Sequence, residues 1–241
     1  MLKGLSSALS FLTILPAKSY DLKTVARYMY VFPIIGLGIG LLIGLVGYGA
    51  SFYLDPIIVS LLVVVLIVIV TGIHHTDGLA DFADGLMTKG DKTKKLQSMK
   101  DVSTGSAGIV SIVLYMIGLI IALSMTSGFV LLQAILLSEV LAKFSMVLMA
   151  SMGKSASLGS NSPFIQLMRD KKKLLLAASF TLVPIYALSG NFGFLVFGAV
   201  IGVSLLLLAV SNRNFGGITG DVMGAANDIC RLTSVIIFVS V

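Results

Sequence analysis

The residues of this chain best suited to chemistry lie in one short segment, HHTDGLADFADG, at residues 74–85. The segment holds two histidines and three aspartates, and it directly follows an uncharged run over residues 56–73. Aspartates beside hydrocarbon are energetically costly and usually mark a functional site. We therefore start from this segment as the candidate site.

The spacing of the carboxylates indicates that they share one face. If the helix over residues 56–73 continues through residue 84, Asp77, Asp81 and Asp84 lie within roughly 60° of each other, and His74 lies about 20° further round. Three like charges repel unless a cation lies between them. Mg²⁺ prefers carboxylate oxygens and binds substrate phosphates in its remaining positions. The pattern predicts a metal site for phosphoryl transfer; a solvated helix end without function is the alternative.

The two histidines have less specific roles. His74 or His75 could ligate a metal, contact a phosphate, or bond to nearby backbone at the membrane border. Cys230 is the one cysteine of the chain, so no intrachain disulfide is possible and a zinc site built from several thiolates is not expected.

A second polar group occurs in GGITGDVMGAANDICRL, residues 216–232. Asp221 and Asp228 are seven residues apart and nearly superimposed on one helical face, and Arg231 lies close to the same stripe. We expect Asp221 to complete the metal site formed by the three earlier aspartates. The alternative is a packed membrane helix that contains an Asp228–Arg231 pair.

Two further features could be structural or functional. The segment SMKDVSTGSAG, residues 98–108, has the composition of a helix N-terminus, where free N–H groups also suit a phosphate. Lys100 and Asp101 lie within it and are candidates for substrate contact. Glu139 and Lys143 are four residues apart in an apolar run, which favours an internal ion pair.

Composition and charge spacing determine the fold class. Of 241 residues, 57% are hydrophobic and 12% are charged, about half the usual share of charge in a soluble domain. Uncharged runs are long enough for helices that cross a bilayer. We predict one all-α, polytopic membrane domain over residues 1–241, with about seven transmembrane helices, a partly interfacial N-terminal helix and an interfacial helix near 161–173. The expected spans are 31–54, 56–73, 106–126, 128–152, 174–189, 192–211 and 221–240, the last being the least regular.

The distribution of basic residues predicts the orientation. If these spans are correct, 15 of the 17 lysines and arginines lie in segments on one side. The positive-inside rule makes that side cytoplasmic, so the aspartates lie at the cytoplasmic face of the cell membrane. Contact with lipid phosphate is the simplest role for these basic loops. We expect the lipid bilayer as a partner and no nucleic acid, and we leave a homo-oligomer open.

Three blocks in this order, HHTDGLADFADGL, KLQSMKDVSTGSAGI and GGITGDVMGAAND, resemble the adenosylcobinamide-GDP ribazoletransferase family, also called cobalamin 5′-phosphate synthase. The resemblance runs through nearly the whole chain. One departure is that the fourth span of the family tends to carry an arginine where this chain has the Glu139–Lys143 stretch.

The resemblance implies a reaction and a set of roles. A ribose hydroxyl of α-ribazole, or of its 5′-phosphate, attacks the phosphate next to cobinamide in adenosylcobinamide-GDP, and GMP leaves. Mg²⁺ is the expected cofactor, with Asp77, Asp81, Asp84 and Asp221 as ligands. One of these carboxylates, His74 or His75 would accept the hydroxyl proton. Lys100, Asp101 and Arg231 are the expected substrate contacts.

Two other functions compete with this interpretation. A CDP-alcohol phosphotransferase would use similar metal chemistry, but Phe82 occupies the place of an arginine in that family's core, and Lys89 occupies the place of an aspartate. A cation transporter would use its carboxylates for ion transit, but here they cluster at one surface and no inverted repeat is visible. A purely structural membrane subunit would explain none of the three blocks.

Overall fold

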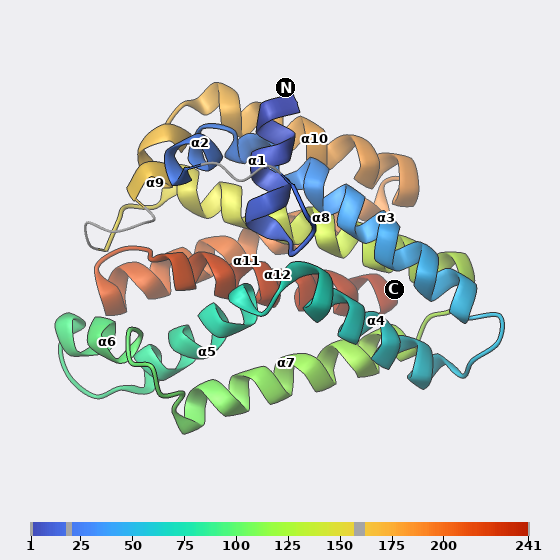
Figure 1. Cartoon of the computed structure of the whole chain (residues 1–241), viewed down its shortest axis with the longest axis horizontal. Helices are drawn as coiled ribbons and strands as arrows, with labels where there is room; N and C mark the ends of the chain where they lie inside the picture. Colours follow the sequence, from blue (N-terminus) through green and yellow to red (C-terminus); the bar gives the residue numbers. More distant parts are fainter. Residues whose placement is uncertain (1, 18–20, 157–161, 241) are drawn as a thin grey trace.

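This computed structural model describes residues 2–17, 21–156 and 162–240. The regular elements within these residues are all helices (Figure 1). In chain order the helices are α1 (Leu2–Leu12), α2 (Leu22–Arg27), the 3-10 helix η1 (Met29–Val31), α3 (Phe32–Ala50), α4 (Pro56–Thr71), α5 (His74–Met87), α6 (Lys92–Ser98), α7 (Ser106–Ser124), α8 (Gly128–Met152), α9 (Ser162–Met168), α10 (Lys171–Ser189), α11 (Phe192–Phe215) and α12 (Gly220–Ser240).

Six helical segments of the described chain are long and apolar enough to cross a membrane. They are η1 with α3, and α7, α8, α10, α11 and α12; α4 and α5 would add a seventh if they were counted together as one broken span. The prediction of an all-α polytopic membrane protein is therefore confirmed. Six of the predicted spans agree with these segments to within a few residues, and α10 and α11 extend slightly beyond them. The predicted span over residues 56–73 corresponds to α4, which qualifies only together with α5.

The expected straight helix through residues 56–84 is wrong. It breaks at Gly72, whose φ of +64° lies in the left-handed region that favours glycine, and the axes of α4 and α5 meet at 94°. The second piece, α5, is helical by itself, so the shared face of the aspartates is preserved. The break separates an apolar helix from an amphipathic one, and α5 is not one of the six candidate spans.

Close packing of α3 against α8 forms the centre of the upper layer in Figure 1. Gly36, Gly40 and Gly44 recur every four residues along α3 and face α8. A Cβ atom at Gly36 would lie 2.5 Å from the carbonyl oxygen of Glu139, and one at Gly40 would lie 2.7 Å from Cα of Leu136. Small residues at this spacing allow two membrane helices to approach closely.

The helix α12 crosses α5 in a similar way. A Cβ atom at Gly78 of α5 would lie 3.0 Å from the backbone of Asp221, and one at Gly224 of α12 would lie 3.2 Å from the carbonyl oxygen of His75. The other neighbour of α5 is α7. This sandwich fixes the position of the HHTDGLADFADG segment relative to Asp221.

The N-terminal segment forms a small cover with α9 at one end of the molecule (Figure 1). Phe11 of α1 packs against Phe164 of α9, with ring centroids 5.4 Å apart, and against Phe32 at 6.0 Å. Short helices at both predicted interfacial segments are consistent with the sequence; residue 161 of the second segment lies outside the described residues.

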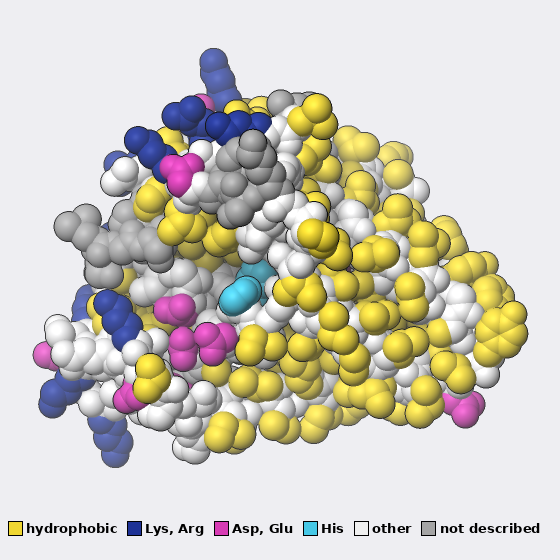
Figure 2. Space-filling view, in the orientation of Figure 1, with side chains coloured by type: hydrophobic (Ala, Val, Ile, Leu, Met, Phe, Trp, Pro, Cys, Tyr) yellow, Lys and Arg dark blue, Asp and Glu magenta, His cyan; other side chains and the backbone are white. Residues whose placement is uncertain are grey.

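Charged side chains are unevenly distributed on the surface. On the face shown in Figure 2, lysines and arginines gather at the end that carries α2, α6 and α9, whereas hydrophobic side chains cover the other end. This arrangement agrees with the predicted grouping of basic segments on one side; Lys18 lies outside the described residues.

Candidate functional site

Four aspartates meet where α5 crosses the first turn of α12. Asp77, Asp81 and Asp84 come from α5 and Asp221 comes from α12. We call these four residues the carboxylate cluster. Figure 2 shows acidic side chains beside the histidines on the surface. The predicted grouping of these residues across two distant blocks of sequence is thus found in the structure.

The charge of the cluster is largely uncompensated at Asp81. Partial burial, followed by the neighbouring charges of Asp221, Asp77 and Asp84, raises the pKa of Asp81 to about 6. Among the described residues, no side chain or amide donates a hydrogen bond to the carboxylate of Asp77 or of Asp81. Both carboxylates are therefore available to a ligand.

Asp84 differs from its neighbours because both of its oxygens are engaged. One accepts from the amide of Gly105 at 2.7 Å and the other from the amide of Gly108 at 2.8 Å. A Cβ atom at either glycine would lie 2.5 Å from a carboxylate oxygen. Asp84 therefore stabilises the free N–H groups at the start of α7. The sequence indicated an N-cap region here but not its partner.

Asp221 is oriented by the residue two positions before it. The Thr219 hydroxyl donates to Asp221 Oδ2 at 3.3 Å and accepts from the amide of Val222 at 3.2 Å. The charge of Lys100 lies within electrostatic range of Asp221. Lys100 belongs to the second of the three sequence blocks, so the fold brings a cation of that block toward the cluster.

The donor set fits a hard divalent cation by its chemistry, because all four groups offer carboxylate oxygens and their charges repel. Within residues 2–17, 21–156 and 162–240, however, no three His, Cys, Asp or Glu side chains stand in the geometry of a metal centre. Asp77, Asp81 and Asp221 are the available candidates, and Asp84 is shared with α7. The metal site stays a prediction.

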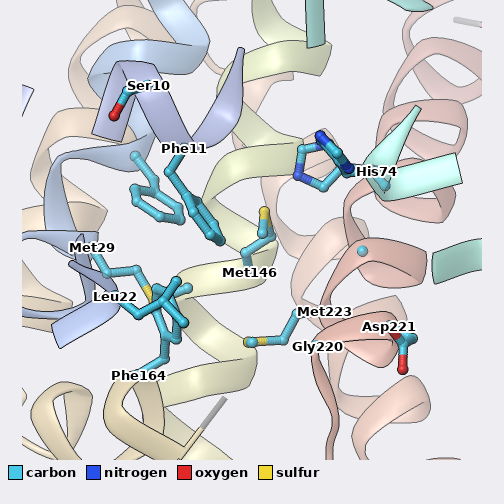
Figure 3. A pocket seen from close by; sticks show the side chains of 13 residues that line it. Ser10, Phe11, Leu22, Met29, His74, Met146, Phe164, Gly220, Asp221 and Met223 are labelled. Atoms are coloured by element: carbon cyan, nitrogen blue, oxygen red, sulfur yellow. The ribbon is translucent and has the colours of Figure 1, made fainter. Parts of the chain in front are cut away.

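Both histidines line a cavity of about 420 Å³ beside Asp221. His74 is exposed, whereas His75 is 7% exposed and its Nδ1 atom has no hydrogen-bond partner among the described residues. Figure 3 shows His74 and Asp221 on one side of this cavity and Phe11, Leu22 and Phe164 on the other. The cavity therefore has a polar end and an apolar wall.

Arg231 lies in a buried group of charges instead of facing this cavity. Its Nε donates to Glu139 Oε1 at 2.5 Å, and its Nη1 donates to Asp228 and to the Tyr115 hydroxyl. Lys143 Nζ lies 3.5 Å from Glu139 Oε2. We call Glu139, Lys143, Asp228 and Arg231 the ion network. The expected Glu139–Lys143 pair is confirmed, and the Asp228–Arg231 pair of the alternative interpretation is also present. The structure therefore favours a structural role for Arg231.

Two polar residues of this region were not singled out from the sequence. Thr76 donates to Asp228 Oδ2 at 3.0 Å, which joins α5 to the ion network. Asn227 accepts from Lys143 Nζ at 2.7 Å and donates to Asp228 Oδ1 at 2.8 Å. Their position inside the first and last motif blocks was the available signal, but their partners lie on other helices.

Asp101 lies in the exposed loop before α7. It accepts from the hydroxyl of Ser103 at 2.6 Å and from its amide at 3.0 Å, and these bonds, the hydroxyl first, lower the pKa of Asp101. Asp84, Asp101 and Ser103 line a small polar cavity of about 320 Å³. The structure thus gives Asp101 a turn-forming role, and its substrate role stays a prediction.

The fold and site define a polytopic helical membrane protein with a group of carboxylates at its surface. The chain belongs to the cobalamin-5-phosphate synthase family, which it matches over residues 4–239. It is 34% identical to an adenosylcobinamide-GDP ribazoletransferase of Methanocella arvoryzae, with 97% of this chain and 94% of that protein covered.

Other relatives carry the same description. The protein of Archaeoglobus fulgidus is 34% identical, with 94% of this chain and 93% of the relative covered, and that of Pyrococcus abyssi is 33% identical, with 95% and 94% covered. No solved structure matches the chain. These relatives do not favour a CDP-alcohol phosphotransferase or a cation transporter.

Proposed function

We propose that this protein transfers the adenosylcobinamide-phosphate group from adenosylcobinamide-GDP to α-ribazole or its 5′-phosphate. The products are GMP and adenosylcobalamin or its 5′-phosphate. The observation that carries the proposal is the carboxylate cluster beside a cavity, in a chain that matches cobalamin-5-phosphate synthases over residues 4–239.

The reaction exchanges one phosphorus–oxygen bond for another. The oxygen of a ribose hydroxyl attacks the phosphorus next to cobinamide, and the bond from that phosphorus to the GMP oxygen breaks. A phosphodiester between cobinamide and the nucleoside remains. The proton of the hydroxyl passes to a base of the protein, and GMP leaves with the bonding electron pair.

Mg²⁺ is the proposed cofactor, held by Asp77, Asp81 and Asp221 with Asp84 beside them. When bound, it supplies neutralising charge for the pyrophosphate and for the leaving GMP. The repulsion among these carboxylates supports the proposal, because a group of like charges is costly unless something positive lies among it. Lys100 adds a protein cation next to Asp221.

The positions of the two histidines suggest separate roles. His74 is exposed and lines the cavity, so it can accept a proton from a bound hydroxyl and release it to water. His75 is nearly buried, and its unpartnered Nδ1 suits a hydrogen bond that orients the substrate. Asp101 would act through the loop that positions Lys100.

The grouping of basic residues at one end supports an orientation with the site at the cytoplasmic face of the cell membrane. There the soluble substrates are accessible to the carboxylate cluster while the apolar helices stay in lipid. Whether several copies associate in the membrane is left open by the sequence.

Release of GMP tests the proposal. Protein purified in detergent is mixed with adenosylcobinamide-GDP, α-ribazole and Mg²⁺, and GMP is measured by chromatography. We expect release only when both substrates are present, and loss of release with EDTA that excess Mg²⁺ restores. Folded protein that releases no GMP would refute the transferase, and release that persists in EDTA would refute the metal.

A further inference from the structure

The cavity beside Asp221 has the size and composition of a small-molecule site. Its volume is about 420 Å³, within the range of roughly 300–1,000 Å³ that is usual for ligand pockets. It lies between the N-terminal segment with α9 on one side and α5 with α12 on the other, and Met146 of α8 lies between them (Figure 3). Segments from five regions of the chain thus meet at one cavity.

The wall opposite the histidines is aromatic and apolar. Phe11 is the centre of an aromatic group, with the ring of Phe164 at 5.4 Å and that of Phe32 at 6.0 Å. Met146 and Met223 extend this wall between the aromatic group and α12 (Figure 3). Phenylalanine rings and methionine sulfur pack well against flat aromatic ligands.

The other end of the cavity offers polar groups to a ligand. His74, His75 and Asp221 line it there. The Nδ1 atom of His75 is buried and has no partner among the described residues, although buried polar atoms are nearly always hydrogen-bonded. A ligand that is apolar at one end and carries hydroxyl groups at the other would complement both halves.

We propose that this cavity binds the acceptor nucleoside, with its aromatic base against Phe11 and Phe164 and its ribose toward His75 and Asp221. The inference rests on the proposed function, because it assigns one of the two substrates to the site. The dimethylbenzimidazole base of α-ribazole is flat and apolar, and a ribose at the polar end would bring its hydroxyl groups beside the carboxylate cluster.

The other parts of the substrates fit this cavity less well. A corrin ring with its amide side chains is several times larger than a two-ring base. Guanine carries donors and acceptors along its edges, and the apolar wall offers it a side-chain partner only at Ser10 within the described lining. Adenosylcobinamide-GDP therefore approaches the carboxylate cluster from outside the cavity.

Calorimetric titration of the full-length protein in detergent tests the assignment, with α-ribazole and GMP as separate probes. Phe11→Ala removes an aromatic contact from a residue that is 37% exposed, and Leu22→Trp fills the cavity from a residue that is 42% exposed. We expect each variant to weaken α-ribazole binding on the order of tenfold. Phe129→Ala, at a phenylalanine that is 56% exposed and does not line the cavity, should bind like the wild type.

Two outcomes would overturn the assignment. One is α-ribazole binding that neither cavity variant changes, and the other is loss of GMP binding in the same variants, which would give the cavity to the guanine nucleotide. A nucleoside with adenine in place of the benzimidazole should bind more weakly than α-ribazole to the wild type, because the apolar wall leaves the amino group of adenine unpaired. Equal binding of the two would contradict an apolar base site.

Binding and GMP release, measured on the same protein preparation, distinguish failure of this inference from failure of the proposed function. If α-ribazole binds as expected but no GMP is released from both substrates with Mg²⁺, the transferase fails and the binding site stands. If GMP is released and both cavity variants keep the wild-type KM for α-ribazole, the transferase stands and the cavity assignment fails.

Discussion

Two groups of charges share the helix α12, one together with α8 and the other together with α5, and they differ in how their charges are balanced. The ion network combines two acids, Glu139 and Asp228, with two bases, Lys143 and Arg231, all 1% exposed or less. The carboxylate cluster combines four acids with no base among its members. Asp221 and Asp228 lie only seven positions apart in α12. Acids close together in the sequence thus belong to groups whose charges are balanced differently.

The comparison separates charges that are paired inside the protein from charges that are not. Charges buried among helices are tolerated when each has a partner, and removal of one partner leaves the other uncompensated. Asp77 and Asp81 of the cluster have no such partner among the described residues, which is unfavourable for the metal-free protein and favourable for binding a cation. The hydrogen bond from Thr76 to Asp228 connects the two groups, so the network also holds the helix that presents the cluster.

The largest effect on stability is expected from Arg231→Ala. It leaves Glu139 and Asp228 buried without their shared cation, which costs about 3–5 kcal/mol of the free energy of unfolding. The melting temperature in detergent measures this loss, with Arg213→Ala at the exposed end of α11 as the matched control. A variant that keeps the wild-type melting temperature but loses activity would instead give Arg231 the substrate role that the sequence suggested.

In the carboxylate cluster, Asp81→Asn should lower activity and raise stability, whereas Arg231→Ala in the ion network lowers stability. We expect GMP release to fall about 100-fold or more because a metal ligand is lost. The metal-free variant should melt at a higher temperature than metal-free wild type at pH 7, because one of four repelling charges is gone. Activity and melting temperature are measured on the same preparation. A folded variant with near wild-type turnover would remove Asp81 from the site.

Asp84→Asn should lower both stability and activity. An amide side chain can accept only one of the bonds from Gly105 and Gly108, so we expect a loss of about 1–3 kcal/mol of stability as well as lower activity. The melting temperature compared with that of Asp81→Asn separates the residues. Equal shifts for the two variants would show that Asp84 does not anchor α7.

The smallest effect concerns pH. The pKa of Asp81 is raised from 3.8 to about 6 in the folded metal-free protein. Between these two pH values the folded protein therefore binds a proton at Asp81 that the unfolded chain does not bind. The contribution to stability is fully present below pH 4 and is lost as the pH rises through about 6. Metal-free wild type should therefore lose more melting temperature between pH 5 and pH 7.5 than Asp81→Asn does. Parallel curves for the two proteins would contradict this raised pKa.

Much of the fold follows from the sequence because hydrophobic length determines membrane helices directly. The uncharged runs located the spans, and glycines with φ of +54° and +56°, Gly128 and Gly190, stand at two of the breaks between them. The break at Gly72 was missed, because the 94° bend depends on how α5 packs between α7 and α12 and not on the local run of residues.

The candidate site was predictable in its membership and not in its partners. Asp77, Asp81 and Asp84 share a face by helical spacing, and the motif blocks added Asp221. Asp84 bonds to the start of α7, and Arg231 bonds to Glu139. Both partners lie on helices that are distant in the sequence, so no local pattern reveals them. The apolar wall of the cavity was likewise hidden, because Phe11 and Phe164 are ordinary hydrophobic residues in their own segments.

Direct measurement of metal binding tests the central claim that the unbalanced cluster holds a divalent cation. Mn²⁺, a paramagnetic substitute for Mg²⁺, is titrated into the purified protein and the free ion is followed by electron paramagnetic resonance. The wild type and Arg213→Ala should bind Mn²⁺ in competition with Mg²⁺, and Asp81→Asn and Asp221→Asn should bind it at least tenfold more weakly. Equal Mn²⁺ affinity in all four proteins would contradict the account.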